Sequence, residues 1–363
     1  MSEAQNMPIA LALSGGGIRA MAFHLGVLRW LAENKALEQV SHISTVSGGS
    51  LILGLILQET SLQWPTSQVF QELVMPTLRQ KLCSRSLMND AISQLRHPSN
   101  WRFLLSRANL VAMALRESWQ VSGTLADLPV TPEWSINGTT AETGKRFRFK
   151  QKDLGDYVLG YASSSHFPLA NALAVSAAFP GGIGPLVIDA SSYEWHKRPW
   201  NEPPEQAKPV TPLYPKLHLY DGGVYDNLGL EPFFDAGKGQ VKGNLPSEVA
   251  LVVSDAGAPL AQGFSLGALN PWRMKRVNDI MSDQARALRV RTFVAYLLKG
   301  VNRGAYLYIG EPISEMRPCP SALFSANFPT TLKRLSESEF DRLVEHGYQV
   351  TSKYQREFGI ILN

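Results

Sequence analysis

A serine between a short strand-like run and a helix-like run most constrains how this chain folds. Residues 42–46 are mostly β-branched or apolar, which is typical of a buried strand. Ser47, Gly48 and Gly49 follow, and residues 51–57 are apolar enough to begin a buried helix. Small residues at the joint permit a strained strand-to-helix turn that pushes a serine hydroxyl clear of the sheet. The stretch therefore predicts a serine presented for nucleophilic chemistry.

Two further apolar runs, 9–13 and 217–221, also predict buried strands, and glycines follow both of them. The second run ends in Asp221. The glycines are Gly15, Gly16 and Gly17 after the first run, and Gly222 and Gly223 after the second. Ligand sites of open α/β sheets gather at the carboxyl ends of their strands. We therefore expect Ser47, the glycine loop and Asp221 to meet at one edge of a sheet.

The three motifs occur in a fixed order: Gly-Gly-Gly-x-Arg at 15–19, Ser-Gly-Gly at 47–49 and Asp-Gly-Gly at 221–223. In this combination the chain resembles the patatin-like phospholipases, which are serine acyl hydrolases with a Ser-Asp dyad. The resemblance runs from about Ile9 to Asp221. It implies an α/β fold of three layers, in which a mostly parallel central sheet carries helices on both faces.

The resemblance also implies roles for individual residues. Ser47 would be the nucleophile and Asp221 its base, although a free aspartate has a pKa of about 3.9 and needs burial to become a stronger base. The glycine loop would form the oxyanion hole, where each backbone donor contributes roughly 3 to 4 kcal/mol. Arg19 would either orient this loop or hold a phospholipid head group. The remaining glycines would support the turns; they are Gly48, Gly49, Gly222 and Gly223.

Three departures from the family pattern leave other functions open. Thr45 stands where the elbow usually has a glycine and is expected to crowd the turn, and Ser14 and Ala20 also depart from the pattern. A lipid- or partner-binding protein with weak catalysis is therefore one alternative. Residues 15–20 also fit a dinucleotide-binding fingerprint, but the next strand lacks the acid that would hold a ribose. His218 lies three residues before Asp221, so strand alternation points it away from the dyad.

Composition indicates one large globular domain over 1–363. The chain is 44% hydrophobic and 18% charged, and Cys83 and Cys319 do not make a disulfide framework. The first eight residues lack a basic region and an apolar run, so we expect no secretory signal and a cytoplasmic protein. A net charge of +4 favours contact with an anionic membrane, whereas no dense basic run indicates nucleic acid. No residue cluster predicts a metal or other cofactor.

Three regions are expected to surround the core. Residues 61–120 predict helices that cover one side of the sheet, with a lid or lipid-docking surface as the alternative because arginines alternate with Trp, Phe and Leu. Residues 191–215 are rich in Pro and Trp and predict an exposed, mobile insertion or cap. A small-residue helix at 170–180 and a C-terminal helix at 336–358 complete the expected fold. The leading interpretation is a serine esterase that cleaves fatty-acyl esters of phospholipids or lysophospholipids.

Overall fold

The computed structural model describes residues 7–199, 202, 204–264, 267, 270, 272–315 and 318–359. Its centre is a parallel sheet in which β1 lies between β13 and β2. Long apolar runs form these strands because helices cover both of their faces. In spatial order the parallel strands are β14 (Gly304–Tyr308), β13 (Ala250–Asp255), β1 (Ile9–Leu13), β2 (Val40–Thr45) and β3 (Glu133–Thr140). The predicted fold class is confirmed.

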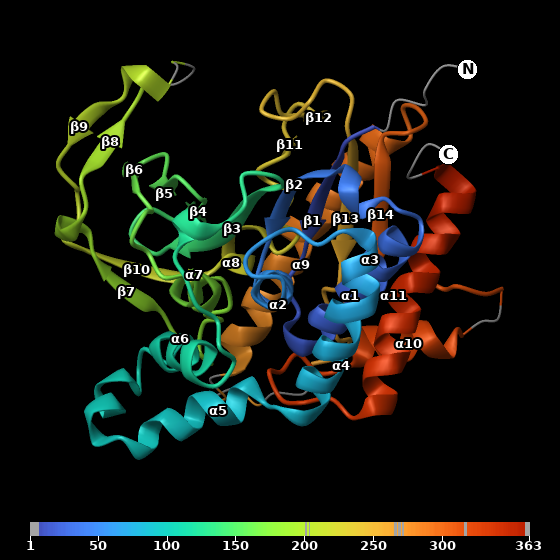
Figure 1. Ribbon diagram of the computed structural model, residues 1–363, viewed down its shortest axis with the longest axis horizontal. Helices are drawn as coiled ribbons and strands as arrows, with labels where there is room; N and C mark the ends of the chain where they lie inside the picture. Colours follow the sequence, from blue (N-terminus) through green and yellow to red (C-terminus); the bar gives the residue numbers. More distant parts are fainter. Residues whose placement is uncertain are drawn as a thin grey trace.

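Beyond β3 the same sheet continues with antiparallel strands, which form the left side of Figure 1. These strands are β4 (Lys145–Phe149), β5 (Asp153–Asp156), β6 (Gly160–Ser163), β8 (Trp195–Lys197) and β9 (Lys208–Val210). The region 191–215, predicted as an exposed insertion or mobile cap, contributes β8 and β9, which extend the sheet beyond β6. Residues 200, 201 and 203 of this region lie outside the described residues.

Helices cover both faces of the central sheet. Side chains that alternate along β1 enter two separate cores: Ile9 and Leu11 pack with the first helix layer, and Ala10 and Ala12 with the second. The first layer contains α1 (Gly17–Glu33), α2 (Gly48–Glu59) and α11 (Glu337–Phe358), and the second contains α9 (Trp272–Leu297). Figure 1 shows α1 and α11 in front of the sheet and α9 behind it.

Short helices follow α2 along the chain. They are α3 (Ser67–Val69), η2 (Phe70–Val74), α4 (Met75–Ser84), α5 (Leu87–Ser93), η3 (Gln94–Arg96), η4 (Pro98–Phe103) and α6 (Ala108–Glu117). Of these, α4, α5 and α6 lie in the lower part of the molecule in Figure 1. Helix α6 packs on α7 (Leu169–Ser176), which also packs on α2 and against β3 and β10. The earlier helices α3, η2 and α4 contact α1, α2 or α11 directly. This arrangement places helices along the side of the molecule on which β1 and β2 end.

The strand that carries Asp221 approaches the site from an unexpected direction. β10 (Lys216–Asp221) is antiparallel to β3 and to β7 (Leu186–Asp189). Gly138 of β3 pairs with Asp221, whereas Thr45 of β2 pairs with Ile136. Because β4 occupies the other side of β3, β2 and β10 run toward each other along the same side of that strand. The ends of β2 and β10 therefore meet beside β3, with β10 antiparallel to that strand.

Candidate active site

Ser47 occupies the strained turn that the sequence predicts. Its backbone has φ 52° and ψ −118°, and it caps the amino end of α2. Positive φ is costly for a residue with a side chain, so the surrounding structure must hold it there. Gly48 and Gly49 make that possible: an added Cβ would lie 2.3 Å from the Gly17 carbonyl oxygen and 2.4 Å from the Leu13 carbonyl oxygen, respectively. The glycines beside the serine are therefore required by close backbone contacts.

Asp221 lies directly beside Ser47. The Ser47 hydroxyl donates a hydrogen bond to the Asp221 carboxylate. Asp221 is only 4% exposed. The Gly223 amide donates to Oδ1 of Asp221 at 2.7 Å. Burial raises the pKa of this carboxyl from 3.8 to about 7, and the two hydrogen bonds oppose that rise. Asp221 therefore combines contact with the serine and a pKa suited to accepting its proton near neutral pH.

The glycine loop packs against the serine. A Cβ added at Gly15 would lie 3.1 Å from Cβ of Ser47. The Gly15 amide, however, donates to the Asn227 carbonyl oxygen at 3.1 Å. Among the described residues, the amides of Gly16 and Gly17 make no hydrogen bond to the protein. The Gly15 amide is thus engaged by Asn227, and the role of the loop as an oxyanion hole stays a prediction.

Gly16 and Gly17 also adopt backbone angles that favour glycine, with φ of 151° and 62°. A Cβ at Gly17 would lie 2.5 Å from the Thr331 carbonyl oxygen. The next amide, that of Ile18, donates to the same carbonyl at 2.7 Å. A segment near the end of the chain thus fixes the loop that faces Ser47.

Arg19 lies beneath the loop and is 2% exposed. Its Nε donates to the Ala256 carbonyl oxygen at 3.1 Å, and its terminal nitrogen donates to the Phe328 carbonyl oxygen. Burial lowers the pKa of the guanidinium to about 10, while Asp255 opposes that change. Of the two predicted roles, these contacts favour orienting the loop over binding a head group.

Ser14 and His24 hold the loop from the other side. The buried imidazole of His24 lies 2.9 Å from the Ser14 carbonyl oxygen through Nε2 and 2.7 Å from the Ser254 hydroxyl through Nδ1. Burial lowers the pKa of His24 to about 4, so the ring is neutral at pH 7. The Ser14 hydroxyl accepts from the Ala256 amide at 2.7 Å. The serine that replaces the usual acid is thus a structural link between β1 and β13.

A directed chain of hydrogen bonds supports the turn at Ser47. Trp134 Nε1 donates to the Thr45 hydroxyl at 2.8 Å, and the Ser176 hydroxyl donates to the Asn137 carbonyl oxygen at 2.7 Å. Ser50 lies between them, 2.7 Å from each hydroxyl. Because the Ser176 proton is used for the Asn137 carbonyl, Ser176 must accept from Ser50, and Ser50 must in turn accept from Thr45. The hydrogen bonds therefore run from Trp134 through Thr45 and Ser50 to Ser176. The hydroxyl of Thr45 is therefore satisfied by this network.

Ser176 also connects this network to Ser47. Its hydroxyl accepts the backbone amide of Ser47 at 3.0 Å. Sequence reasoning missed Ser176 and Asn137, because the helix and strand that carry them are distant from Ser47 in sequence. The only available signal was the small-residue composition of the predicted helix at 170–180, which permits this close approach.

Other titratable groups are placed away from the serine. His218 Nδ1 pairs with Oε1 of Glu142 at 2.5 Å and is exposed, which agrees with its predicted orientation away from the dyad. Within the part of the chain that is described, no group of three His, Cys, Asp or Glu side chains is arranged to hold a metal ion. The hydrogen bond between Ser47 and the buried Asp221 carboxylate is an arrangement suited to nucleophilic attack by the serine with the aspartate as proton acceptor.

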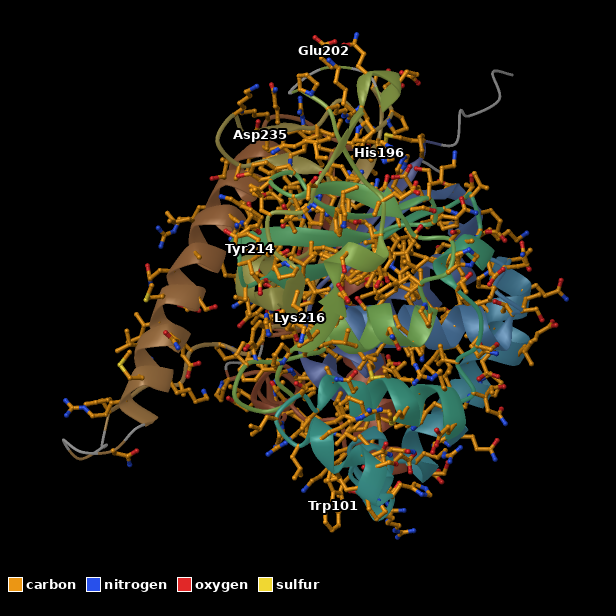
Figure 2. The ribbon with its side chains drawn as sticks, turned by 90° about the vertical axis from the view of Figure 1, so that its left-hand side faces the viewer. Trp101, His196, Glu202, Tyr214, Lys216 and Asp235 are labelled. Atoms are coloured by element: carbon orange, nitrogen blue, oxygen red, sulfur yellow. The ribbon has the colours of Figure 1, made fainter. Side chains whose placement is uncertain are left out.

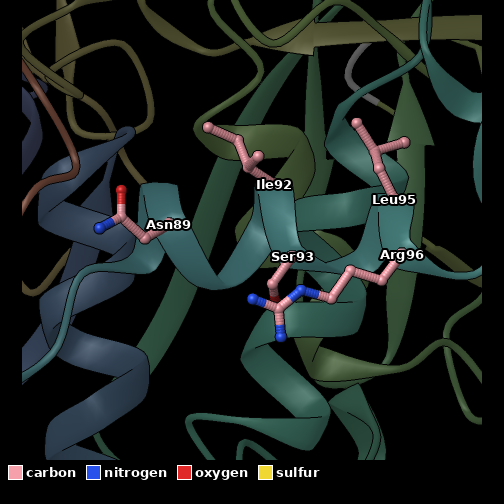
Figure 3. A pocket seen from close by; sticks show the side chains of 5 residues that line it. All are labelled: Asn89, Ile92, Ser93, Leu95 and Arg96. Atoms are coloured by element: carbon pink, nitrogen blue, oxygen red, sulfur yellow. The ribbon is translucent and has the colours of Figure 1, made fainter.

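Two surface cavities lie in the helical part of the molecule. One of about 410 Å³ is lined by residues of α5 and η3, where Ile92 and Leu95 point to one side and Ser93 and Arg96 to the other (Figure 3). The other, of about 590 Å³, lies between α4 and the start of α11. Neither is lined by Ser47 or Asp221, so neither defines the site described above.

A comparison with protein families identifies the chain. The model of the patatin-like phospholipase family matches residues 11–234, which include the glycine loop, Ser47 and Asp221. This chain belongs to the patatin-like phospholipase family. The match supports a lipid hydrolase and favours that prediction over the dinucleotide-binding alternative. No curated protein sequence matches the chain at a significant level.

Solved structures share the patatin-like fold of this chain at low sequence identity. Human GIVD cytosolic phospholipase A2 aligns with a TM-score of 0.56 and 13% identity, covering 97% of this chain and 59% of that chain. The same human enzyme in complex with methyl gamma-linolenyl fluorophosphonate aligns with a TM-score of 0.52 and 15% identity, covering 97% and 58%. This patatin-like chain thus spans less than two thirds of the human protein. At such identity the comparison establishes the fold.

Proposed function

We propose that this protein hydrolyses fatty-acyl ester bonds of phospholipids or lysophospholipids through an acyl-enzyme formed on Ser47. The observation that carries the proposal is the hydrogen bond between the Ser47 hydroxyl and the buried Asp221 carboxylate. Membership of the patatin-like phospholipase family supports a lipid substrate. The predicted cytoplasmic location, with peripheral contact at an anionic inner membrane surface, is part of the same proposal. No helix in the described residues has the length and hydropathy of a membrane span.

In the first half-reaction, Oγ of Ser47 attacks the ester carbonyl carbon and its proton passes to Asp221. Negative charge develops on the carbonyl oxygen, and the amides of Gly16 and Gly17 are the donors we assign to it. Preorganised donors of this kind lower the barrier by roughly 3 to 4 kcal/mol each. When the carbon–oxygen bond to the leaving alcohol breaks, Asp221 returns the proton to that alcohol, and the acyl group remains on Ser47.

In the second half-reaction, water attacks the acyl carbon and Asp221 accepts the proton of that water. The same amides hold the second oxyanion. Collapse of the intermediate releases the fatty acid, and the proton on Asp221 returns to Oγ of Ser47. One carboxyl group thus serves as base and acid in turn, which matches the absence of a histidine contact to Ser47 among the described residues.

The direct test is fatty-acid release from mixed phospholipid vesicles by the wild type, Ser47→Ala and Asp221→Asn. Both substitutions should lower the rate by about a thousandfold or more, since members of a nucleophile-base pair act as a unit. Ser338→Ala is the matched control, because this serine is exposed at the start of α11. It should retain wild-type release.

Labelling with a fluorophosphonate tests whether Ser47 is a reactive nucleophile, independently of fatty-acid release. The human phospholipase A2 that shares this fold is described with methyl gamma-linolenyl fluorophosphonate, which makes this class of probe suitable here. Mass spectrometry should locate the adduct on Ser47 of the wild type. Unlabelled wild-type protein without fatty-acid release would reject the esterase proposal and favour the predicted lipid- or partner-binding alternative. Activity retained by Ser47→Ala would reject the assignment of the nucleophile.

A further inference from the structure

Helix α9 carries a stripe of exposed apolar side chains between Met274 and Leu288. Met274, Val277, Met281 and Leu288 are 66%, 46%, 66% and 60% exposed, respectively. Their spacing of three, four and seven residues places them on one face of the helix. We call these four residues the α9 stripe. Contiguous apolar surface of this kind on a folded protein marks a site of interaction.

The opposite side of α9 packs on the body of the protein. Phe293 is fully buried with Phe234 in the second core, and Arg286 donates to Oδ2 of the buried Asp255 at 2.8 Å through Nε. Figure 2 shows the other end of the helix projecting from the body at the lower left. The α9 stripe therefore faces outward, and no described residue of this chain buries it.

A second exposed apolar group lies at the end of η4 and just after it. Trp101 is 59% exposed, Leu104 47% and Leu105 88%. We call residues 101–105 the η4 segment. Figure 2 shows Trp101 at the lower edge of the molecule, on the same side to which α9 projects. Trp101 and the projecting end of α9 thus both lie in the lower part of that view.

The η4 segment is linked to the Asp221 side of the site. The Asp221 amide donates to the Ala178 carbonyl oxygen at 3.1 Å. Phe179, the residue after Ala178, is 54% exposed. The same loop reaches the η4 segment, because Arg107 donates to the Gly182 carbonyl oxygen at 3.1 Å and a Cβ on Gly184 would lie 2.9 Å from the Leu105 carbonyl oxygen.

The α9 stripe is linked to the glycine-loop side of the site. A Cβ on Gly16 would lie 2.8 Å from the Ala256 carbonyl oxygen, so residues that follow β13 touch the loop. The same stretch contacts the start of α9: Arg276 donates to the Ala261 carbonyl oxygen at 2.6 Å, and Arg273 lies over the ring of Phe264 at 5.6 Å. The η4 segment is thus connected to the Asp221 side of the site, and the start of α9 to the glycine-loop side.

We infer that the α9 stripe and the η4 segment together dock this protein on the surface of an anionic phospholipid bilayer, with the dyad between them. The inference rests on the proposed function, since a substrate whose acyl chains lie in a bilayer must reach Ser47 from that surface. Apolar side chains enter the boundary between head groups and acyl chains, and basic side chains beside them bind anionic head groups.

Charge favours a bilayer as the occupant. Arg273, Lys275 and Arg276 lie in the first turns of α9, where Asp279 pairs with Lys275 at 2.6 Å. Arg102 lies within the η4 segment and Arg107 follows it, and both are exposed. The complete chain carries a net charge of +4. Basic groups at both apolar surfaces complement an anionic membrane.

The test measures co-sedimentation with vesicles of equal parts phosphatidylcholine and phosphatidylglycerol, and with vesicles of phosphatidylcholine alone. All proteins carry Ser47→Ala, so that binding is measured without turnover. Adding Leu105→Gln and Leu288→Gln should weaken binding to the anionic vesicles about tenfold or more, because two exposed leucines lose their contact with the acyl region. Leu298→Gln is the matched control: Leu298 is 74% exposed and lies beyond the far end of α9.

Binding that is absent from both kinds of vesicle, or unchanged by the two substitutions, would overturn the inference. So would self-association in gel filtration that Leu288→Gln abolishes while vesicle binding persists, because the stripe would then be a contact between two copies. Thermal unfolding of each variant checks that the fold is retained. Labelling of Ser47 by a soluble fluorophosphonate in the wild type is independent of docking. Failure of the docking surface and failure of the proposed function are therefore distinguishable.

Discussion

At the scale of the residue, Ser47 and Asp221 each occupy a state that is costly in isolation. Ser47 has a positive φ, and Asp221 is a buried carboxyl whose pKa rises to about 7. Each cost has a chemical consequence, since the turn presents the hydroxyl and burial makes the carboxylate a stronger base. Backbone amides and carbonyls around the two residues maintain both states.

The raised pKa predicts how activity depends on pH. Asp221 must be ionised to accept the serine proton, so kcat/KM should rise with pH and level off above about pH 7. Well below that pKa, each pH unit should lower kcat/KM about tenfold. The measurement is kcat/KM for a soluble short-chain ester across this range. A profile that stays flat down to about pH 5 would contradict the assigned base.

The pH dependence of the free energy of unfolding checks the same pKa independently. Stability should fall as pH rises, whereas kcat/KM should rise. The folded carboxyl binds its proton more tightly than the unfolded one, so the native state loses stability as pH rises from about 4 to about 7. The shift corresponds to roughly 4 kcal/mol, since each pKa unit represents about 1.4 kcal/mol. Asp221→Asn lacks this titration. Its Tm relative to the wild type should therefore increase across that pH range.

At the scale of the element, β3 determines where the dyad forms. β2 ends opposite the first half of β3, and β10 arrives opposite the second half from the other direction. Asn137 and Gly138 lie at the junction: a Cβ on Gly222 would be 2.4 Å from the Asn137 carbonyl oxygen. Helix α7 then packs beside this junction and brings Ser176 to the Ser47 amide. Four elements thus share one small polar cluster.

Ser176→Ala tests this cluster. The substitution leaves the buried Ser47 amide and Ser50 hydroxyl without their acceptor, which should cost about 1 to 3 kcal/mol of stability. We expect kcat and the rate of fluorophosphonate labelling to fall about tenfold, with little change in KM, because the turn is held less firmly while the substrate surface is intact.

Ser325→Ala is the matched control for that substitution. Ser325 is fully buried, and its hydroxyl has no hydrogen-bond partner among the described residues. Its removal should leave kcat unchanged and should not lower the free energy of unfolding through a lost hydrogen bond. Equal effects of the two substitutions on kcat would show that Ser176 acts only through general stability and would reject its positioning role.

At the scale of the whole molecule, segments beyond the family match complete both the core and the site. β13 and β14 cover the edge of β1, and Thr331 and Phe328 hold the glycine loop and Arg19 through their carbonyl groups. The long helix α11 crosses α1 at two glycines, Gly26 and Gly347. These contacts connect the last quarter of the chain with the loop that faces Ser47.

Gly347→Ala tests that crossing. Alanine normally stabilises a helix relative to glycine by about 1 kcal/mol, but here a Cβ would lie 2.2 Å from the Phe23 carbonyl oxygen. Overpacking of this kind costs about 1 to 3 kcal/mol, so the free energy of unfolding should fall. Urea unfolding measures the change. Gly243→Ala is the control, since nothing lies within 4 Å of its added Cβ; a wild-type midpoint for Gly347→Ala would contradict the close crossing.

The local elements and the main site residues follow from the sequence because each depends on short-range pattern. The apolar runs predict β1, β2 and β10, and the glycines beside Ser47 predict a turn that tolerates positive φ. The order of the three glycine motifs predicts the family, which the comparison confirms. Catalytic roles for Ser47 and Asp221 stay predictions, now supported by the contact between the two side chains.

Tertiary structure alone decided how these parts combine. The direction of β10, the engagement of the Gly15 amide by Asn227, and the hydroxyl chain from Thr45 to Ser176 all depend on contacts between residues far apart in sequence. The region at 191–215 joins the sheet edge for the same reason, since strand pairing is satisfied by a partner elsewhere in the chain. Hydrophobic pattern specifies which residues are buried, but hydrogen bonds between distant segments specify which polar groups meet.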